Sequence, residues 1–269
     1  MSRLVPRTPT SAVDTIGQFL RAHALGNGSE GVVVGLSGGI DSALVARLAR
    51  DALGAEHVLG ILLPDAAFPE ELLRETEEYA RTLGIKWRTI PIETVEAAYR
   101  ALVPELADPV SLGNVKARIR MTIDYAIARE GHRLVAGTGN KSEILLGYFT
   151  KYGDGGVDLL PLGDLYKTDV RAIAEDLQLP AAIRERPPTA GLWEGQTDEG
   201  ELGMTYADLD QILYGLEQLR SEEEIASLTG FPVDRVRAIE ERVMRFRHKR
   251  RLPPIPKLRL RTVGIDWRD

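Results

Sequence analysis

The most constraining feature of this sequence is a short apolar run followed directly by a glycine turn and a helix start. Residues 32–35 read Val-Val-Val-Gly, which is typical of a parallel strand buried on both faces. Residues 36–42 read Leu-Ser-Gly-Gly-Ile-Asp-Ser, and a run of small and apolar residues then favours a helix. Glycine leaves no Cβ in the way of a ligand, and a helix start presents unpaired N–H groups with a partial positive charge. The pattern therefore predicts a phosphate-binding loop.

The spacing of this loop differs from that of two familiar phosphate-binding motifs. A Walker A loop needs a Lys after its last glycine, whereas Ile40 follows Gly39, and the dinucleotide fingerprint of three spaced glycines is absent. Residues 37–42 instead resemble the SGGxDS loop of the ATP pyrophosphatases, or PP-loop enzymes. That resemblance implies cleavage of ATP between its α- and β-phosphates. The alternative is an ordinary strand–turn–helix connection made of small residues.

The composition of the chain excludes several kinds of site and partner. The chain has no cysteine, which excludes disulfides, thiolate zinc sites and cysteine nucleophiles. Its net charge of −6 argues against a general nucleic-acid partner. Residues 1–7 lack a signal-peptide core, and no apolar stretch is long enough to span a membrane, so we expect a cytoplasmic protein with no membrane partner.

Strand and helix signals alternate along the first half of the chain. We expect strands at 31–36, 57–63, 86–90 and 133–137, and helices at 11–25, 41–53, 69–83 and 112–128. This alternation predicts an α/β fold with a doubly wound parallel sheet. Ligands of such sheets bind at the carboxyl ends of the strands, so residues 35–42 and 137–143 should form one site.

The second half of the chain is mainly helical. Helices are expected at 167–177, 205–218, 221–228 and 232–247, with an irregular segment at 151–156 and a mobile loop at 187–203. We expect residues 1–269 to form a single domain. Its α/β core would span about residues 28–185, and a helical C-terminal extension with the mobile loop would span about residues 186–269.

Several polar residues outside the first loop are candidates for the site. Glu143 could face Asp41 and bind Mg²⁺ with it, although Glu143 could equally be the N3 residue of a helix capped by Asn140. Lys167 opens a helix, where a positive charge is unfavourable, so either a nearby anion explains it or the side chain is solvated. The glycine-rich segment 147–158 could bring backbone close to a ligand, or it could be a surface turn.

Two basic segments are further candidates for binding an anion. Lys116 and Arg120 lie four residues apart on the predicted helix 112–128, and the commoner explanation of such spacing is a solvated face. Residues 245–251 hold five Lys or Arg residues and one His. An anionic small ligand or a partner subunit suits this acidic protein better than nucleic acid.

Taken together, these segments resemble the ammonia-dependent NAD(+) synthetase family over about residues 31–254. The most specific matches are residues 35–42, 113–118, 149–158, 188–192, 201–206 and 248–250. The resemblance implies an adenine nucleotide α-hydrolase-like, Rossmann-like fold. It also implies a homodimeric carbon–nitrogen ligase that uses ATP, ammonia and deamido-NAD, with the 111–128 helix as our candidate for the centre of the interface.

The resemblance also implies roles for individual residues. The ATP-binding residues would be Gly35, Leu36, Ser37, Gly38, Gly39, Ile40, Asp41, Ser42, Thr138, Lys167 and Thr189. Deamido-NAD would be held by Arg118, Lys151, Asp158, His248 and Lys249, the last two in their own or in the other subunit's site. Asp41 and Glu143 would bind Mg²⁺. Many members carry Asp-His where this chain has Gly139-Asn140, so a role for that Asp cannot be transferred.

The implied reaction has two steps. The nicotinate carboxylate attacks the α-phosphorus of ATP to give an acyl-adenylate and pyrophosphate, and ammonia then displaces AMP. Asp41 and Lys167 are the candidate catalytic residues of the first step, and Asp154, with Asp158 as the alternative, is the candidate proton acceptor for ammonium. Closure of the 189–203 loop would exclude water from the adenylate. Glutamine-dependent relatives carry an added amidase domain with a Cys nucleophile, so free ammonia is expected here.

Two rival functions also fit a PP-loop. Another PP-loop activity, such as tRNA thiolation or GMP synthesis, is one; thiolation normally needs cysteines and a positive RNA surface. A nucleotide-sensing module without turnover is the other, but a sensor has no need of Asp41, Glu143 and Lys167.

Overall fold

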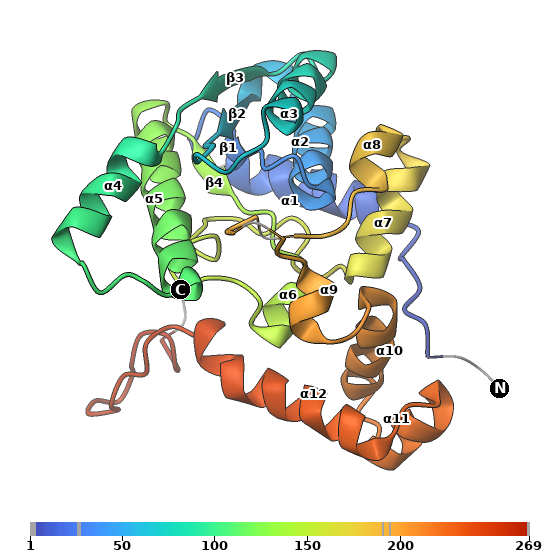
Figure 1. Ribbon diagram of the computed structural model, residues 1–269. Helices are drawn as coiled ribbons and strands as arrows, with labels where there is room; N and C mark the ends of the chain where they lie inside the picture. The colour runs from blue at the N-terminus through green and yellow to red at the C-terminus, as the bar shows by residue number, and fades with distance from the viewer. Residues whose placement is uncertain (1–3, 26–27, 190, 194, 268–269) are drawn as a thin grey trace.

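A computed structural model describes residues 4–25, 28–189, 191–193 and 195–267, so Ala190 of the 188–192 segment lies outside the described residues. At its centre are four parallel strands in the order β3-β2-β1-β4 (Figure 1). Their bounds are β1 Val32–Gly35, β2 Val58–Leu62, β3 Lys86–Thr89 and β4 Leu134–Ala136. The doubly wound parallel sheet expected from the sequence is confirmed.

The sheet is covered on both faces because its central strand is apolar throughout. Val32 and Val34 point into one cluster, and Val33 points into the other. The first cluster is closed by α1 (Ala12–Ala24), α2 (Ile40–Leu53), α3 (Glu70–Thr82), α7 (Lys167–Asp176) and α8 (Ala181–Arg184). The second is closed mainly by α5 (Pro109–Glu130), which α4 (Glu93–Leu102) adjoins.

A third cluster lies among the C-terminal helices, away from the sheet (Figure 1). It joins α6 (Lys141–Leu146) to α10 (Tyr206–Glu217), α11 (Glu222–Thr229) and α12 (Val233–Arg245). Leu146 and Tyr166, which follow the sheet in sequence, are buried in this cluster together with Tyr206. The helical extension is therefore packed directly on the segment that carries the candidate residues Glu143 and Lys167.

Several elements differ from the expectation, and three of them bear on the site or its surroundings. The helix predicted at 112–128 begins earlier, at Pro109, because the Asp108 side chain accepts a hydrogen bond from the Ser111 N–H at 2.8 Å. The helix α4 was not predicted; none of its residues is fully buried, and Val95, Tyr99 and Leu102, which repeat at helical spacing, are exposed. The segment predicted as a loop at 187–203 contains a short helix, α9 (Asp198–Leu202).

The expectation of a solvated basic face is wrong for Lys116. This side chain is 8% exposed, and its Nζ lies 2.7 Å from Oδ2 of Asp65, which follows β2. Arg120 also approaches Asp65, at 3.6 Å. The spacing of Lys116 and Arg120 alone suggests a charged surface stripe. The carboxylate of Asp65 instead pairs with both side chains in a largely buried ion-pair network. No helix in the described part of the chain is both long and apolar enough to cross a membrane.

Asp124 of α5 carries a carboxyl group that packs beside Gly35 at the end of β1. Its Oδ2 lies 3.6 Å from where a Cβ on Gly35 would be, and its buried Oδ1 has no hydrogen-bond partner among the described residues. Burial raises the pKa of Asp124 to about 7, against the opposing charge of Arg120. The ordinary value is 3.8, so the folded state binds this proton more tightly, and stability falls as the pH rises from about 4 to about 7.

The Asp124→Asn variant should therefore be more stable than the wild type at pH 8, because the amide removes the buried charge. This advantage should shrink as the pH falls and vanish near pH 4, where both folded and unfolded wild type carry the proton. Thermal midpoints of the two proteins measured across this range test the assignment. A difference between them that does not change with pH would contradict it.

Candidate functional site

The loop that follows β1 is held by its own serines. The hydroxyl of Ser42 accepts a hydrogen bond from the Ser37 N–H at 3.2 Å and donates to the Gly39 carbonyl at 3.0 Å. The Ser37 hydroxyl in turn accepts from the Gly39 N–H at 3.3 Å. These bonds fold the chain tightly ahead of α2, whose first-turn N–H groups lack partners within the helix. The loop thus has the strand–turn–helix geometry expected of an anion site.

Gly38 is the residue of this loop that tolerates least change. Its φ is +78°, and a Cβ added there would lie 2.5 Å from Leu72 Cδ1 and 2.8 Å from Thr76 Oγ1. Its carbonyl accepts a hydrogen bond from Arg186, which also pairs with Glu75 of α3. The loop is therefore confined from two sides.

The Gly38→Ala variant should lower the free energy of unfolding by about 1–3 kcal/mol and should abolish nucleotide binding by the loop. Gly84→Ala is the matched control, because Gly84 also has a positive φ, +70°, but nothing lies within 4 Å of its added Cβ. The control should lose stability alone. Thermal melts and ATP titrations of both variants check the prediction, and wild-type ATP affinity in Gly38→Ala would contradict it.

The ends of β1 and β4 meet, as expected of neighbouring parallel strands. Asn140, which follows β4, donates a hydrogen bond from Nδ2 to Oδ1 of Asp41 at 2.9 Å. The chain leaves β1 toward β2 and β3, whereas β4 lies on the other side of β1, so this is the topological switch point of the sheet. Thr138 lies in the same turn after β4 and is half-buried.

Glu143 has both of the properties that the sequence left as alternatives. It is the N3 residue of a capping box: the Asn140 side chain accepts from the Glu143 N–H, and Glu143 Oε2 accepts from the Asn140 N–H at 3.2 Å. Its other oxygen, Oε1, accepts from Lys167 Nζ at 3.1 Å. The cap thus fixes the carboxylate with one oxygen directed at the same point as Asp41.

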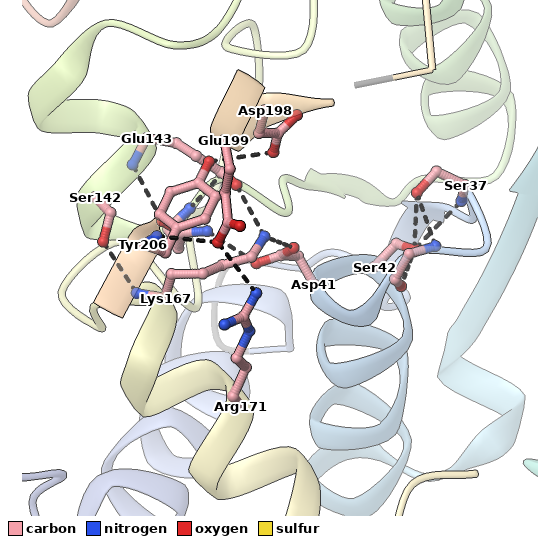
Figure 2. Close-up of polar contacts among 12 residues, drawn as sticks. Ser37, Asp41, Ser42, Ser142, Glu143, Lys167, Arg171, Asp198, Glu199 and Tyr206 are labelled. Atoms are coloured by element: carbon pink, nitrogen blue, oxygen red, sulfur yellow. Dashed lines mark hydrogen bonds and ion pairs between the residues drawn. The ribbon is translucent and has the colours of Figure 1, made fainter. Parts of the chain in front are cut away.

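Lys167 lies between the two carboxylates (Figure 2). Its side chain is 3% exposed, so the solvated alternative is wrong, and Nζ lies 2.5 Å from Asp41 Oδ2. Burial opposes the charge on Lys167, but the carboxylates of Asp41 and Glu143 outweigh burial and raise its pKa. The side chain is therefore a fixed ammonium group at the mouth of the loop.

Asp198 and Tyr206 also belong to this cluster, and the sequence analysis did not predict a role for either of them. Asp198 of α9 is buried, and its Oδ2 accepts a hydrogen bond from the Tyr206 hydroxyl at 3.1 Å. Burial raises the pKa of Asp198, whereas the Lys167 ammonium opposes that rise. Lys167 Nζ also lies 5.1 Å from the centre of the Tyr206 ring. The Lys167 ammonium group therefore contacts Asp41 and Glu143 directly, and Asp198 joins the cluster through Tyr206 (Figure 2).

This donor set fits a magnesium ion. Mg²⁺ is commonly bound by one or two carboxylates together with substrate phosphates, and Asp41 and Glu143 supply hard oxygens beside the loop, where Lys167 Nζ is their cationic partner in this structure. In the residues that the structure describes, no three or more Asp, Glu, His or Cys side chains form a metal site made of protein alone. A metal here would accordingly need ligands from a bound substrate.

Hydrogen bonds connect the 187–203 segment, which was expected to be a mobile loop, to its neighbours. The Asp198 N–H donates to the Pro188 carbonyl at 3.1 Å, which brings Thr189 toward α9. Thr189 itself is exposed, and its Oγ1 accepts from the Gly191 N–H at 3.1 Å. Lys116 of α5 donates to the Leu192 carbonyl at 3.2 Å. The loop is thereby linked to the sheet domain as well as to α9.

Four of the basic residues assigned to deamido-NAD form a second group. Arg118 donates to the Lys151 carbonyl at 3.3 Å, and Lys151 Nζ donates to the His248 carbonyl at 2.8 Å. Lys249 Nζ donates to the carbonyls of Gly147 and Phe149 at 2.7 and 2.6 Å. His248 and Lys249 thus lie against the glycine-rich segment of their own chain.

The two aspartates of the glycine-rich segment are placed differently. Asp154 is exposed, its Oδ1 accepts from the Thr150 N–H at 2.8 Å, and its charge opposes the burial that lowers the pKa of Lys249. Asp158 holds the end of the segment on β4, because it accepts hydrogen bonds from the Val135 N–H and the Tyr125 hydroxyl. Asp154 is therefore the freer of the two carboxylates.

Part of the basic segment 245–251 has a structural role. Arg250 donates to the Leu145 carbonyl at 2.8 Å, and Arg242 of the preceding helix donates to the Leu146 carbonyl at 3.1 Å. These carbonyls belong to the last turn of α6, where positive charge is favourable. The segment thus anchors the end of the short helix that carries Glu143.

Comparison with known proteins agrees with this geometry. A protein-family model described as NAD synthase matches residues 12–253. The NH(3)-dependent NAD(+) synthetase of Methanococcoides burtonii is 49% identical and covers 92% of this chain and 95% of its own length. The solved NMN synthetase of Francisella tularensis is 33% identical with a TM-score of 0.82, over 94% of this chain and 100% of its own.

A second solved structure, the NH3-dependent NAD synthetase of Campylobacter jejuni, is 31% identical with a TM-score of 0.78, over 92% of this chain and 98% of its own. The family match includes the loop after β1, the Lys167 cluster and the helices through α12. Sequence, fold and site therefore agree, and this chain belongs to the NAD synthase family.

Proposed function

We propose that this protein is an ammonia-dependent NAD(+) synthetase, a carbon–nitrogen ligase that converts deamido-NAD to NAD with ATP. The observation that carries the proposal is the Lys167 ammonium fixed between Asp41 and Glu143 at the end of the SGGxDS loop. That arrangement occurs in a chain 49% identical to an NH(3)-dependent NAD(+) synthetase over 92% of its length. Deamido-NAD, ATP and ammonia are the proposed substrates, and AMP and pyrophosphate are the proposed by-products.

In the first proposed step, a carboxylate oxygen of deamido-NAD bonds to the α-phosphorus of ATP, and the bond from that phosphorus to the bridging oxygen breaks. The negative charge on the leaving pyrophosphate needs positive partners. The loop of residues 37–42, the start of α2 and Lys167 supply N–H groups and one full charge. We propose that Asp41 and Glu143 hold Mg²⁺, which when bound would neutralise phosphate charge. Thr138 and Thr189 would contact ATP.

In the second proposed step, ammonia bonds to the acyl carbon, the bond to the AMP oxygen breaks, and the nitrogen releases one proton to solvent to give the amide. The nucleophile must be neutral, so ammonium must first lose a proton. We propose Asp154 as the acceptor, because Asp158 already uses both oxygens as acceptors in the fold. Arg118, Lys151, His248 and Lys249 would hold the phosphates of deamido-NAD, and Asp158 would contribute through the segment that it anchors.

We also propose that the enzyme is a homodimer and that residues 1–269 act as one domain. The large side chains of Tyr99, Leu102 and Val110 on and beside α4 and α5 are 44%, 80% and 54% exposed, which favours a protein partner for that face. The shared burial of Leu146 and Tyr166 with the C-terminal helices favours a single domain. Sedimentation equilibrium tests the dimer.

A second candidate function is amidation of the mononucleotide acid, because the similar Francisella tularensis structure is named NMN synthetase. One assay separates the possibilities. Purified protein is incubated with ATP, Mg²⁺ and ammonium, together with either deamido-NAD or nicotinic acid mononucleotide, and the amide is quantified by mass spectrometry. NAD formed in preference to NMN supports the proposal. Preference for the mononucleotide, or amide formed from glutamine in the absence of ammonium, would overturn it.

A further inference from the structure

We propose that Asp210 of α10 is a positioning residue that holds Lys167 and Glu143 in their places by joining the starts of α6 and α7. This inference rests on the proposed function, because it assigns Asp210 to the reaction of that same site. Asp210 acts on the site indirectly: its hydrogen bonds are to Ser142 and Thr168, which are the sequence neighbours of Glu143 and Lys167.

The contacts of Asp210 are short and made by both of its oxygens. Oδ1 accepts a hydrogen bond from the Ser142 hydroxyl at 2.5 Å, and Oδ2 accepts from the Thr168 backbone N–H at 2.9 Å. The same Ser142 hydroxyl accepts from the backbone N–H of Lys167 at 3.0 Å (Figure 2). Ser142 precedes Glu143 and Thr168 follows Lys167, so one carboxylate fixes the sequence neighbours of two site residues.

The position of this carboxylate also suits α7. The N–H groups of Lys167 and Thr168 belong to the first turn of that helix and have no partners within it. A negative charge near a helix N-terminus is favourable, and here it offsets the unfavourable interaction of the Lys167 charge with the helix dipole. Part of this charge is local, because Asp169 in the first turn accepts a hydrogen bond from the Tyr166 N–H at 3.0 Å. The other part comes from Asp210, which lies 42 positions from Thr168 in the sequence. The start of α7 is therefore held by its own Asp169 and also by Asp210 of α10.

Asp210 is held rigidly in its own helix. It is 0% exposed, and its neighbours Leu209 and Ile212 are also fully buried in the C-terminal cluster. Burial raises the pKa of this carboxyl, and the hydrogen bonds from Ser142 and Thr168 oppose the rise. Burying a carboxylate costs free energy unless hydrogen bonds satisfy its oxygens. The hydrogen bonds from Ser142 and Thr168 satisfy Asp210, and they also align the starts of α6 and α7. A shift of about 1 Å at a reacting group can cost about 100-fold in rate.

Asp210→Asn is the primary test, because asparagine keeps the shape of the side chain. Its oxygen can still accept from Thr168, but its amide group then faces the Ser142 hydroxyl, which must turn its hydrogen away. We expect kcat to fall about 10- to 100-fold, with little change in the KM for ATP. Ile212→Ala is the matched control, since it removes buried packing from the same helix without touching Ser142 or Thr168.

The second readout is independent of activity. Hydrogen exchange of the peptide that contains the Lys167 and Thr168 amides should be faster in Asp210→Asn than in the wild type, and unchanged in Ile212→Ala assayed where both are folded. Wild-type kcat in folded Asp210→Asn would overturn the inference, as would unchanged exchange or a loss matched by Ile212→Ala. If Asp210→Asn does not fold, Ser142→Ala must show the same two effects. Absence of turnover in the wild type would instead defeat the proposed function, and the exchange result would still test the positioning.

Discussion

The Lys167→Met variant is expected to lose about 100- to 1000-fold in turnover, the effect of removing one fixed electrostatic group from a reaction centre. Methionine fills the same space without the charge. Within the described residues, Lys167 is the only cation in contact with Asp41 and Glu143, so its loss leaves two largely buried carboxylates without a positive partner. That should also lower the free energy of unfolding by about 3–5 kcal/mol. Added Mg²⁺ should restore part of this stability.

The control for this variant is Lys141→Met. Lys141 begins α6, near the same site, but its Nζ pairs with Asp164 and Glu217 at 2.9 and 2.7 Å, away from the loop. It should retain turnover close to that of the wild type. Steady-state assays with ATP, ammonium and deamido-NAD, run at a temperature where both variants are folded, decide the matter. A Lys167→Met enzyme with more than a tenth of wild-type turnover would rule out the role given to this ammonium group.

Asp41→Asn should reduce turnover by a comparable factor, about 100- to 1000-fold, and should remove the magnesium dependence of ATP binding. The carboxylate accepts from Asn140 through Oδ1 and from Lys167 through Oδ2. An amide has only one accepting oxygen, so one of these donors would face an NH₂ group. The fold should survive, because the amide has the same size and α2 is anchored by Leu44 and Leu48.

Asp51→Asn, on the same helix, is the matched control for Asp41→Asn. Asp51 pairs at the surface with Arg47 and Arg50, an arrangement that contributes about 0–1 kcal/mol to stability. Calorimetric titration of ATP with and without Mg²⁺ should distinguish the two variants. Magnesium-supported affinity that persists in Asp41→Asn would show that this carboxylate is not a metal ligand.

The sheet was predictable because its signals are local. Val32, Val33 and Val34 form a strand buried on both faces, and alternation of such strands with helices permits few topologies. The α/β pattern predicted that residues 35–42 and 137–143 would share one site, because both follow strands of a parallel sheet. That β1 and β4 are direct neighbours, which brings Asp41 to Asn140, was not predicted. Helix α4 was missed although Val95, Tyr99 and Leu102 repeat at helical spacing, so the sequence did carry a signal for it.

The site was only partly predictable. Asp41, Glu143 and Lys167 were named from motif residues, and they lie together. Asp198, Tyr206 and Asp210 were missed because their roles depend on how the C-terminal helices pack against α6 and α7, and their spacing in the sequence gives no sign of it. Lys116 was misinterpreted for the same reason, since its partner Asp65 lies 51 positions away. Long-range ion pairs leave no periodic pattern.

The central claim is that the loop after β1 directs cleavage of ATP between its α- and β-phosphates during amide formation. ³¹P NMR of the reaction with ATP, Mg²⁺, ammonium and deamido-NAD tests it most directly. AMP and pyrophosphate should appear in equal amounts, matched one to one by NAD, and neither should form without deamido-NAD. Formation of ADP and inorganic phosphate instead would contradict the account.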